Sequence, residues 1–512
     1  MFCAIRMWCG MPAHVATEGR KMSYQTGASF MSVTTGNTPS TELRKGTLGL
    51  GFIIFFVISA AGPLVAIAGG FPIGIMLGNG AGTPALLIAT VAILLMFSAG
   101  YTAMSRYITN AGGFYAFTAR GLGGKAGGAA ALLALLGYNT MQIGLYGMFG
   151  AVSSGFLSMH LGVTMPWWAC SLVAMASIGI FGYRQIDLSA KVLSLLVFGE
   201  YVVVLILDVA ILRHGGASGL NATSFAPHVF LGGAPAIGFL FCFASFVGFE
   251  ATTIYSEEAK DPHRTVPLAT YISVLLIGGF YAFSVWCMVI GAGSDQVVKI
   301  LTGLSDPTTF LYTLSDRYAN STLTGAMSVL FITSVYAGLL AFHNSAARYF
   351  YAAGREGLLP QRLGYTHRRH SSPHVGSLLQ TVLALLVVTI FIITGADPVL
   401  TLFSWLTNVA TLCIIALMAL SSVAVFMFFL THEARDEGVW RIRILPILSG
   451  LALSVVLALA IINFPLLTGA RAGLSYGLTA LLPVFAVIGV LAASALKRRD
   501  PAAFNQLGSS RL

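Results

Sequence analysis

The sequence predicts an all-α membrane protein with twelve transmembrane helices. Three observations support this prediction: the composition, the spacing of the apolar segments and the distribution of the basic residues. Of the 512 residues, 56% are hydrophobic and only 9% are charged, whereas soluble domains carry about 25% charged residues. Glycine is frequent, with 57 residues, which is typical of membrane helices that pack closely or unwind locally.

Twelve segments are long enough to cross a membrane, since a helix needs about 20 mostly apolar residues to span the hydrocarbon core. They cover residues 47–70, 82–105, 126–156, 165–183, 190–212, 234–256, 267–291, 322–350, 376–394, 399–429, 443–465 and 474–496. Residues 1–45 contain no long apolar segment, so we predict a disordered cytoplasmic tail rather than a cleavable signal peptide. Residues 497–512 are expected to form a short basic tail that follows the inner leaflet.

The basic residues predict the orientation. If the N-terminus is cytoplasmic, 24 of the 28 Lys and Arg residues fall in cytoplasmic segments. The four others are Arg213, Lys299, Arg317 and Arg471. Because basic residues concentrate on the cytoplasmic side, both termini are predicted to be cytoplasmic, in a plasma membrane and most simply a bacterial inner membrane. Topology explains the net charge of +10, so no nucleic-acid partner is predicted.

Two long connections lie on opposite sides of the predicted membrane. Residues 106–125 follow span 2 inside, and residues 292–321 follow span 7 outside. These positions are equivalent if spans 1–5 and 6–10 are two repeats of inverted topology, an arrangement typical of secondary transporters. The repeats would cover about residues 46–212 and 234–430, with spans 11 and 12 at 443–496.

The first span contains a predicted break in mid-membrane. Its cluster of small residues and proline is Ser59, Ala60, Ala61, Gly62 and Pro63. Pro63 lacks an N–H group and Gly62 lowers the cost of unwinding. Inverted-repeat transporters bind substrate where such a helix is interrupted, because free N–H groups and helix dipoles there can hold a carboxylate. The alternative is a simple proline kink.

The sixth span has a similar stretch, "FASFVGFE". Small residues that permit unwinding alternate with aromatic residues that can cover a bound molecule: Phe243, Ala244, Ser245, Phe246 and Gly248. We predict a second break and a substrate site here. The alternative is a face of small residues used for helix packing.

Carboxylates inside predicted spans are costly and usually functional. Burial disfavours the charged form of a carboxylic acid, so such a group can exchange protons near neutral pH. We predict Glu200 as the proton-coupling residue and Glu250 as the second candidate. Glu200 could instead pair structurally with an Arg or a hydroxyl. For Glu250 the favoured interpretation is structural, as a lock between the cytoplasmic half of span 6 and a neighbouring helix.

The connection after span 6 carries Glu257, Glu258 and Arg264. We predict that they form a cytoplasmic salt-bridge gate with Arg residues of 106–120 or 348–355; a solvated turn is the alternative. The chain contains no P-loop, HExxH or TVGYG pattern, and its six Cys form no CxxC pair. No enzyme, ATP-driven pump, channel, cofactor, metal site or disulfide framework is therefore predicted.

Three long motifs carry a family resemblance. They are "GFEA" at 248–251 continued by "EEAKDPHRTVP" at 257–267, "NSAARYFYAAGREGLLP" at 344–360, and "NAGGFYAFTARGLG" at 110–123. In this order among the spans they resemble the amino acid–polyamine–organocation superfamily of permeases, over about residues 46–495. The chain departs from it at Gly62-Pro63-Leu64, where many relatives carry Gly-x-Gly, and at Glu200, where some proton-coupled relatives carry Lys.

The resemblance implies a LeuT-type fold with a 5+5 inverted repeat and discontinuous helices 1 and 6. It implies that a substrate carboxylate meets the break in span 1 and that its ammonium meets carbonyls near Phe243–Ser245. Phe246 would be an aromatic gate, and Tyr138 and Gln142 on span 3 would line the substrate path.

The predicted function is therefore secondary active transport of a small molecule, an amino acid or related amine, by proton-coupled uptake. An exchanger, a transporter-like nutrient sensor and sodium coupling stay open as alternatives. The oligomeric state is not indicated by the sequence.

Overall fold

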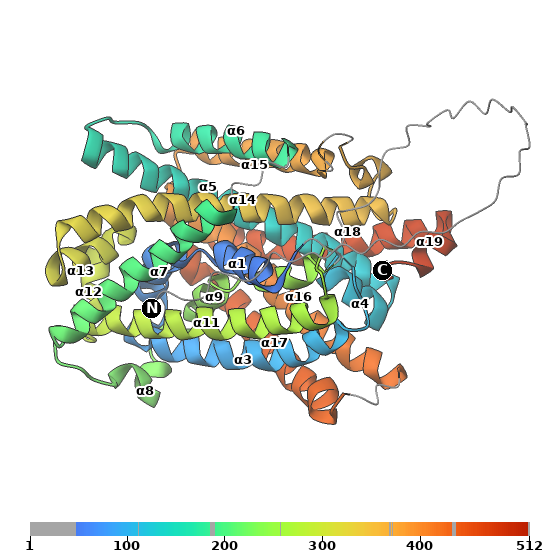
Figure 1. The fold of residues 1–512 in the computed structure, drawn as a ribbon, viewed down its shortest axis with the longest axis horizontal. Helices are drawn as coiled ribbons and strands as arrows, with labels where there is room; N and C mark the ends of the chain where they lie inside the picture. The colour runs from blue at the N-terminus through green and yellow to red at the C-terminus, as the bar shows by residue number, and fades with distance from the viewer. Residues whose placement is uncertain are drawn as a thin grey trace, which may run out of the picture. The chain divides into compact units, whose positions relative to one another are not determined.

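The computed structural model describes residues 48–509, except 111, 185–189, 257, 368–369, 371 and 433–436. The predicted tail at residues 1–45 lies outside the described residues, as does Glu257. The described residues contain no β-strand, and an isolated bridge joins Leu48 to Ala259. Long helices run side by side through the bundle (Figure 1). The prediction of an all-α protein is confirmed.

The helices of the first half begin with an interrupted one. They are α1 (Leu50–Ala61), the π-helical η1 (Val65–Gly70), α2 (Phe71–Gly74), η2 (Ile75–Asn79), α3 (Thr83–Met104), α4 (Phe114–Leu122), α5 (Gly124–Leu161), α6 (Trp167–Arg184) and α7 (Ala190–Arg213). A kink at Gly78 separates the continuation of the first helix from α3.

The second half also begins with an interrupted helix. Its elements are α8 (Pro227–Phe230), α9 (Pro235–Ala244), α10 (Ala251–Ile254), α11 (Pro262–Ala292), α12 (Val297–Gly303), α13 (Phe310–Tyr318), α14 (Ser321–Arg355), α15 (His374–Ile393), η7 (Pro398–Phe403), α16 (Ser404–Thr431), η8 (Trp440–Ile444), α17 (Leu445–Thr468), α18 (Ala472–Arg499) and α19 (Pro501–Asn505).

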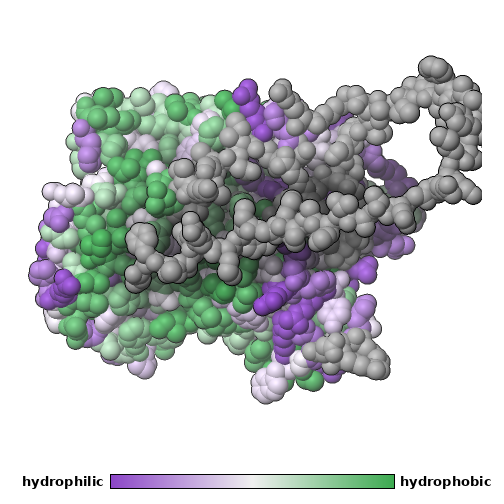
Figure 2. Space-filling view, in the orientation of Figure 1, coloured by the Kyte–Doolittle hydropathy of each residue, from purple (hydrophilic) through white to green (hydrophobic). Residues whose placement is uncertain are grey.

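Helix α5 lies at the centre and packs against α14, α16 and α18. Helices α6 and α15 pair along one side, and α3 and α11 pair along another (Figure 1). Figure 2 shows hydrophobic residues over the middle of the visible face and hydrophilic residues toward its two ends. This distribution suits helices that cross a bilayer, in which backbone groups are satisfied within each helix.

Nine helices of the described part are long and apolar enough to cross a membrane. Predicted spans 1 and 6 are interrupted, which leaves the short apolar helices α1 and α9. The continuation of span 1 joins span 2 in one helical run, Val65–Met104. The 18 residues of α6 form the predicted fourth span but are not among the nine. The structure thus supports a multi-pass membrane protein.

Glycine permits the closest helix contact at the centre. A Cβ atom on Gly128 of α5 would lie 2.4 Å from the carbonyl oxygen of Gly489 in α18. Real Cβ atoms do not approach oxygen so closely, so the two backbones meet only because both residues lack side chains. This contact explains part of the high glycine content, since small residues let membrane helices approach.

Candidate functional site

The first helix is interrupted at the predicted cluster. Helix α1 ends at Ala61, and Gly62 adopts the left-handed φ of 52° before the helix resumes at Val65. Pro63 cannot donate a hydrogen bond, and the Leu64 N–H donates to Glu200 Oε2 at 3.2 Å instead of to a helical carbonyl. Two links of the helical ladder are therefore missing here.

The sixth predicted span is interrupted in the same way. Helix α9 ends at Ala244, the chain runs through turns, and α10 begins at Ala251. Gly248 has a φ of 110°, a conformation that L side chains rarely adopt. Its N–H donates to Glu250 Oε2 at 2.9 Å. The side chain of Glu250 thus stabilises the turn to which Glu250 itself belongs.

A pocket of about 530 Å³ lies between the two interruptions. Its lining comes from both halves of the first helix, from α9, and from α5, α14 and α16: Ala61, Val65, Ala66, Gly70, Phe71, Met141, Leu145, Phe241, Ala244, Ser245, Val247, Gly338, Phe342, Phe403 and Thr407. This volume includes space open to solvent, and only about 40 Å³ of it can hold the centre of a water molecule.

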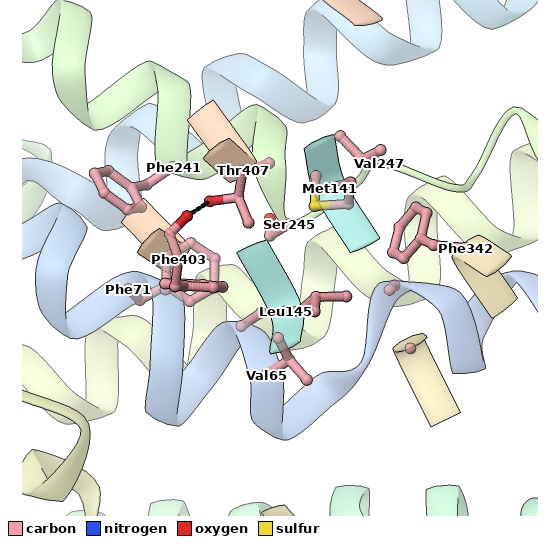
Figure 3. Close-up of a pocket in the computed structure, with 15 residues that line it drawn as sticks. Val65, Phe71, Met141, Leu145, Phe241, Ser245, Val247, Phe342, Phe403 and Thr407 are labelled. Carbon is pink, nitrogen blue, oxygen red and sulfur yellow. Dashed lines mark hydrogen bonds between the residues drawn. The ribbon is translucent and has the colours of Figure 1, made fainter. Parts of the chain in front are cut away.

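The lining is apolar and carries no charged side chain. Three aromatic residues, Phe71, Phe241 and Phe403, gather at one end, and Phe342 lies at the other (Figure 3). The hydroxyls of Ser245 and Thr407 donate to carbonyls of their own helices, at 2.7 and 2.8 Å. A charged group bound here would therefore have to meet backbone dipoles at the interrupted helices.

Some predicted binding residues line this pocket and others do not. Ala61, Ala244 and Ser245 belong to the lining. Gly62 and Pro63 form the adjacent break. Ser59 is buried, and its hydroxyl has no hydrogen-bond partner among the described residues; Ala60 lies in α1.

The aromatic and glycine residues predicted on span 6 lie outside the pocket lining. Phe243 lies with its ring centroid 6.3 Å from that of Phe239. Phe246 packs edge-on against Tyr281 at 6.1 Å, and Gly248 shapes the turn. Their roles in binding and gating stay predictions.

Tyr138 and Gln142 of α5 also lie away from the lining. The Tyr138 hydroxyl donates to Glu250 Oε1 at 2.5 Å. Gln142 contacts His343 Nδ1 at 3.1 Å and accepts a hydrogen bond from Gln380. The polar face of α5 that carries Tyr138 and Gln142 is thus engaged by neighbouring parts of the bundle.

Apart from Thr407, the lining residues that the sequence analysis missed are apolar or glycine. On α5, Met141 lies one position before Gln142 and Leu145 lies three positions after it, so both are on the adjacent face of the helix. Tyr138 and Gln142 were predicted on this helix because they are polar, whereas this pocket is built mainly from apolar side chains. Because α5 has neighbouring helices on several sides, the i, i+4 spacing of Met141 and Leu145 does not by itself distinguish this face from the others.

Glu200 of α7 lies against the break in the first helix. Its side chain accepts hydrogen bonds from the Leu64 N–H at 3.2 Å and from Ser334 Oγ of α14 at 2.6 Å. Glu200 is only 1% exposed, and no ion pair to it is seen within the described part of the chain. The carboxyl group therefore joins α7 and α14 to the interrupted helix without a counter-charge.

Asp208 is a second buried acid on α7. It lies eight residues after Glu200 and accepts a hydrogen bond from Ser284 Oγ of α11 at 2.6 Å. It is also 1% exposed. The two acids contact different helices, so α7 holds two separate buried carboxyl groups.

Of the predicted gate residues, Glu258 has a charged partner. Its Oε1 lies 3.1 Å from Arg348 Nη2 of α14, and the Arg348 guanidinium also covers the ring of Tyr255 at 4.5 Å from the ring centroid. Arg264 does not join this pair; it lines a separate pocket with Arg106 and Arg441. The prediction of a gate stays open for Glu258, and Glu257 lies outside the described residues.

The C-terminal segment docks against the same end of the bundle. Glu356 accepts hydrogen bonds from Asn110 Nδ2 at 3.0 Å, from the Gly508 N–H at 2.9 Å and from the Tyr115 hydroxyl. Burial raises the pKa of Tyr115, and the Glu356 carboxylate raises it further. The phenol therefore stays protonated and can donate. Leu507 is 2% exposed beside the docked backbone.

Replacing Leu507 by Ala is expected to destabilise the protein by about 2 kcal/mol, because a buried leucine is lost and a cavity remains. The melting temperature of the purified protein measures this change. Gln506→Ala, at the exposed preceding position, is the matched control and should leave the melting temperature unchanged. Equal melting temperatures for the two variants would show that the docked segment contributes no stability.

The chain was compared with known proteins. A model of the amino acid permease family matches residues 48–491. The low-affinity putrescine importer PlaP of Escherichia coli is 24% identical over 69% of this chain and 76% of its own length. The branched-chain amino acid permease BcaP of Bacillus subtilis is 26% identical over 60% of this chain and 68% of its own. Human cationic amino acid transporter 4 is 31% identical over 30% of this chain and 23% of its own.

Proposed function

The chain belongs to the amino acid permease family, and from this premise we propose that it takes up an amino acid with an apolar side chain together with protons. The family and the relatives are permeases of amino acids or amines, so the prediction of a transporter rather than an enzyme is confirmed. The substrate within that class, the coupling ion and the direction of transport are the parts that we propose.

The observation that carries the substrate proposal is the uncharged lining of the pocket. Transfer of an ammonium group from water into an apolar site is costly unless a carboxylate or several acceptors receive it. A diamine would bring two such groups into a pocket without an acidic side chain. An amino acid would place its two charged groups at the interrupted helices, where backbone dipoles can bind them, and its apolar side chain among the phenylalanines.

The membrane topology that we propose has twelve spans. The nine long apolar helices include one run that holds the second part of span 1 together with span 2. Counting this run as two spans, and adding α6 and the interrupted span around α9, gives the twelve that the sequence predicts. The basic residues favour cytoplasmic termini and a plasma membrane. The C-terminal ends of α4, α14 and α18 would then face the cytoplasm.

We propose that Glu200 couples transport to protons. Its carboxyl group contacts the break that borders the pocket, and Ser334 connects it to α14. A change of charge at this position would alter the hydrogen bond to the Leu64 N–H and so the geometry of the break. Glu258 and Arg348 would open and close the cytoplasmic side, since their ion pair joins the segment after α10 to α14.

An exchanger and a nutrient sensor are the alternatives. Uptake into proteoliposomes with an imposed proton gradient separates the three. Gradient-driven accumulation supports proton symport, whereas flux that requires internal substrate supports exchange. Binding without flux supports a sensor.

The substrate proposal predicts an effect of filling the pocket at Gly338. A Cβ atom added to Gly338 would have Leu145 Cδ1 as its nearest neighbour, at 3.6 Å. A valine side chain therefore fits at this position without a clash, but it occupies space in the pocket. For Gly338→Val we expect the KM for leucine to rise about tenfold or more, with a smaller change for alanine. Radiolabelled uptake with leucine, alanine, lysine and putrescine measures this.

The control is Gly325→Val, because Gly325 lies in the same helix with open space around it. Its kinetics should match those of the wild type. Uptake of putrescine in preference to all amino acids would refute the proposal of an apolar amino acid.

A further inference from the structure

Arg264 does not lie beside Glu258, with which the sequence predicts that it forms a gate. It lines an open pocket of about 790 Å³ formed where the ends of α3 and η8 meet the start of α11. The lining residues are Arg106, His263, Arg264, Pro267, Leu268, Tyr271 and Arg441. The pocket is separate from the substrate pocket, with which it shares no residue.

The pocket carries an excess of positive charge. Among the residues that the structure describes, Glu437 contacts these arginines: one carboxylate oxygen lies 3.1 Å from Arg106 and the other 2.7 Å from Arg441. Arg441 also donates to the Ala99 carbonyl at 3.1 Å, which fixes its side chain. One carboxylate thus offsets two guanidinium groups.

Arg264 supplies a further cation. Arg264 is exposed, and its backbone N–H donates to the Asp261 carbonyl at 3.3 Å, whereas its side chain shows neither a hydrogen bond nor an ion pair within the described part of the chain. Its guanidinium group is free to bind an anion, and guanidinium groups bind phosphate oxygens with two parallel hydrogen bonds.

The other wall of the pocket is apolar and continues along α11. Leu268 is 39% exposed, and Leu275, seven residues further on the same helix face, is 55% exposed. Basic groups therefore lie at one end of an apolar helix surface. Figure 2 shows hydrophilic residues at the end of a largely hydrophobic face. A molecule that matches both parts has an anionic head and a hydrocarbon chain.

We propose that this pocket binds the phosphate headgroup of an anionic phospholipid, with an acyl chain along the exposed leucines of α11. Basic pockets between helices at the cytoplasmic side suit anionic headgroups, and our proposed topology places this end of α11 in the cytoplasm. The inference does not depend on which amino acid is transported.

Binding of phosphatidylglycerol to the full-length protein in detergent tests the proposal. The readout is the apparent Kd from titration with a fluorescent phosphatidylglycerol, competed by unlabelled lipids with the same acyl chains. Phosphatidylglycerol should compete, and phosphatidylcholine should compete at least about fivefold more weakly. For Arg264→Gln we expect an apparent Kd about fivefold higher, as the loss of one basic group near a lipid phosphate predicts.

Arg362→Gln is the matched control, since Arg362 is another exposed arginine on the same side and outside this pocket. Its Kd should stay at the wild-type value. An equal loss in both variants would indicate nonspecific surface charge and overturn the proposal. Competition by glycerol 3-phosphate or inorganic phosphate as strong as that of the lipid would overturn it in favour of a soluble phosphate ligand. His263→Gln provides a second variant with an expected smaller rise in Kd.

Discussion

Replacing Glu200 by Gln is expected to abolish proton-driven accumulation of substrate in proteoliposomes while exchange across the membrane continues. Glutamine has nearly the same shape, and its amide oxygen can accept the hydrogen bonds that Leu64 and Ser334 donate to the carboxyl group. It cannot bind and release a proton. The variant should therefore keep the geometry of the break and lose only the change of charge. Accumulation should fall at least about tenfold, which corresponds to about 1.4 kcal/mol of lost driving force.

The matched control is Asp208→Asn, at the other buried acid of the same helix. This variant should retain most of the accumulation, because Asp208 contacts Ser284 of α11 and not the break. Full accumulation by Glu200→Gln together with loss in Asp208→Asn would move the coupling site to Asp208. Wild-type flux that ignores the proton gradient but requires internal substrate would refute proton coupling.

Replacing Glu250 by Ala is expected to destabilise the protein by about 3 kcal/mol. The carboxylate receives hydrogen bonds from Tyr138 at 2.5 Å and from the Gly248 N–H at 2.9 Å, and it is 0% exposed. Alanine would leave both donors buried without an acceptor, at a cost of about 1–3 kcal/mol each. Thermal unfolding of the purified protein measures the loss.

Glu250→Gln separates a structural role from a role in coupling. Its amide oxygen can still accept one of the two hydrogen bonds, so most of the stability should remain. If Glu250 is a structural lock, this variant accumulates substrate in response to a proton gradient. Loss of accumulation at unchanged stability would instead show that Glu250 takes part in coupling. Tyr138→Phe removes the hydroxyl that donates to Glu250. If Glu250 is a structural lock, this variant should lower stability without changing accumulation in response to the proton gradient.

The helix interruptions show how far local sequence can predict structure here. Pro63 has no N–H group, and Gly62 adopts a positive φ at little cost. Both properties belong to the residues themselves. The same holds for the small residues around Gly248 in the second interruption. The location of these breaks was therefore predictable within a few residues.

The pocket lining was predictable only in part. Tyr138 and Gln142 were chosen because they are polar, yet their hydrogen bonds go to Glu250, His343 and Gln380. The adjacent face of α5 carries the lining residues Met141 and Leu145. A central helix has neighbours on all sides, so its hydropathy pattern does not reveal which face borders the pocket.

Charged residues at the predicted cytoplasmic end also differ in what the sequence reveals about their partners. Glu258 and Arg264 belong to one short motif, but Glu258 pairs with Arg348 whereas Arg264 lies with Arg106 and Arg441. Glu258 precedes the start of α11 and Arg264 follows it, so the two side chains can point to different neighbours. Their partners come from distant segments that only folding brings near.

The sequence by itself determined the class of protein, the apolar segments, the two interruptions and the presence of buried acids. These features depend on the transfer of side chains from water to lipid and on the backbone chemistry of proline and glycine. The tertiary structure alone decided which side chains line the pocket, that Glu200 contacts the first interruption, and that the chain near Gly508 docks on Glu356. Those features depend on the packing of helices distant in sequence, and the rotation of each helix about its axis sets which groups meet.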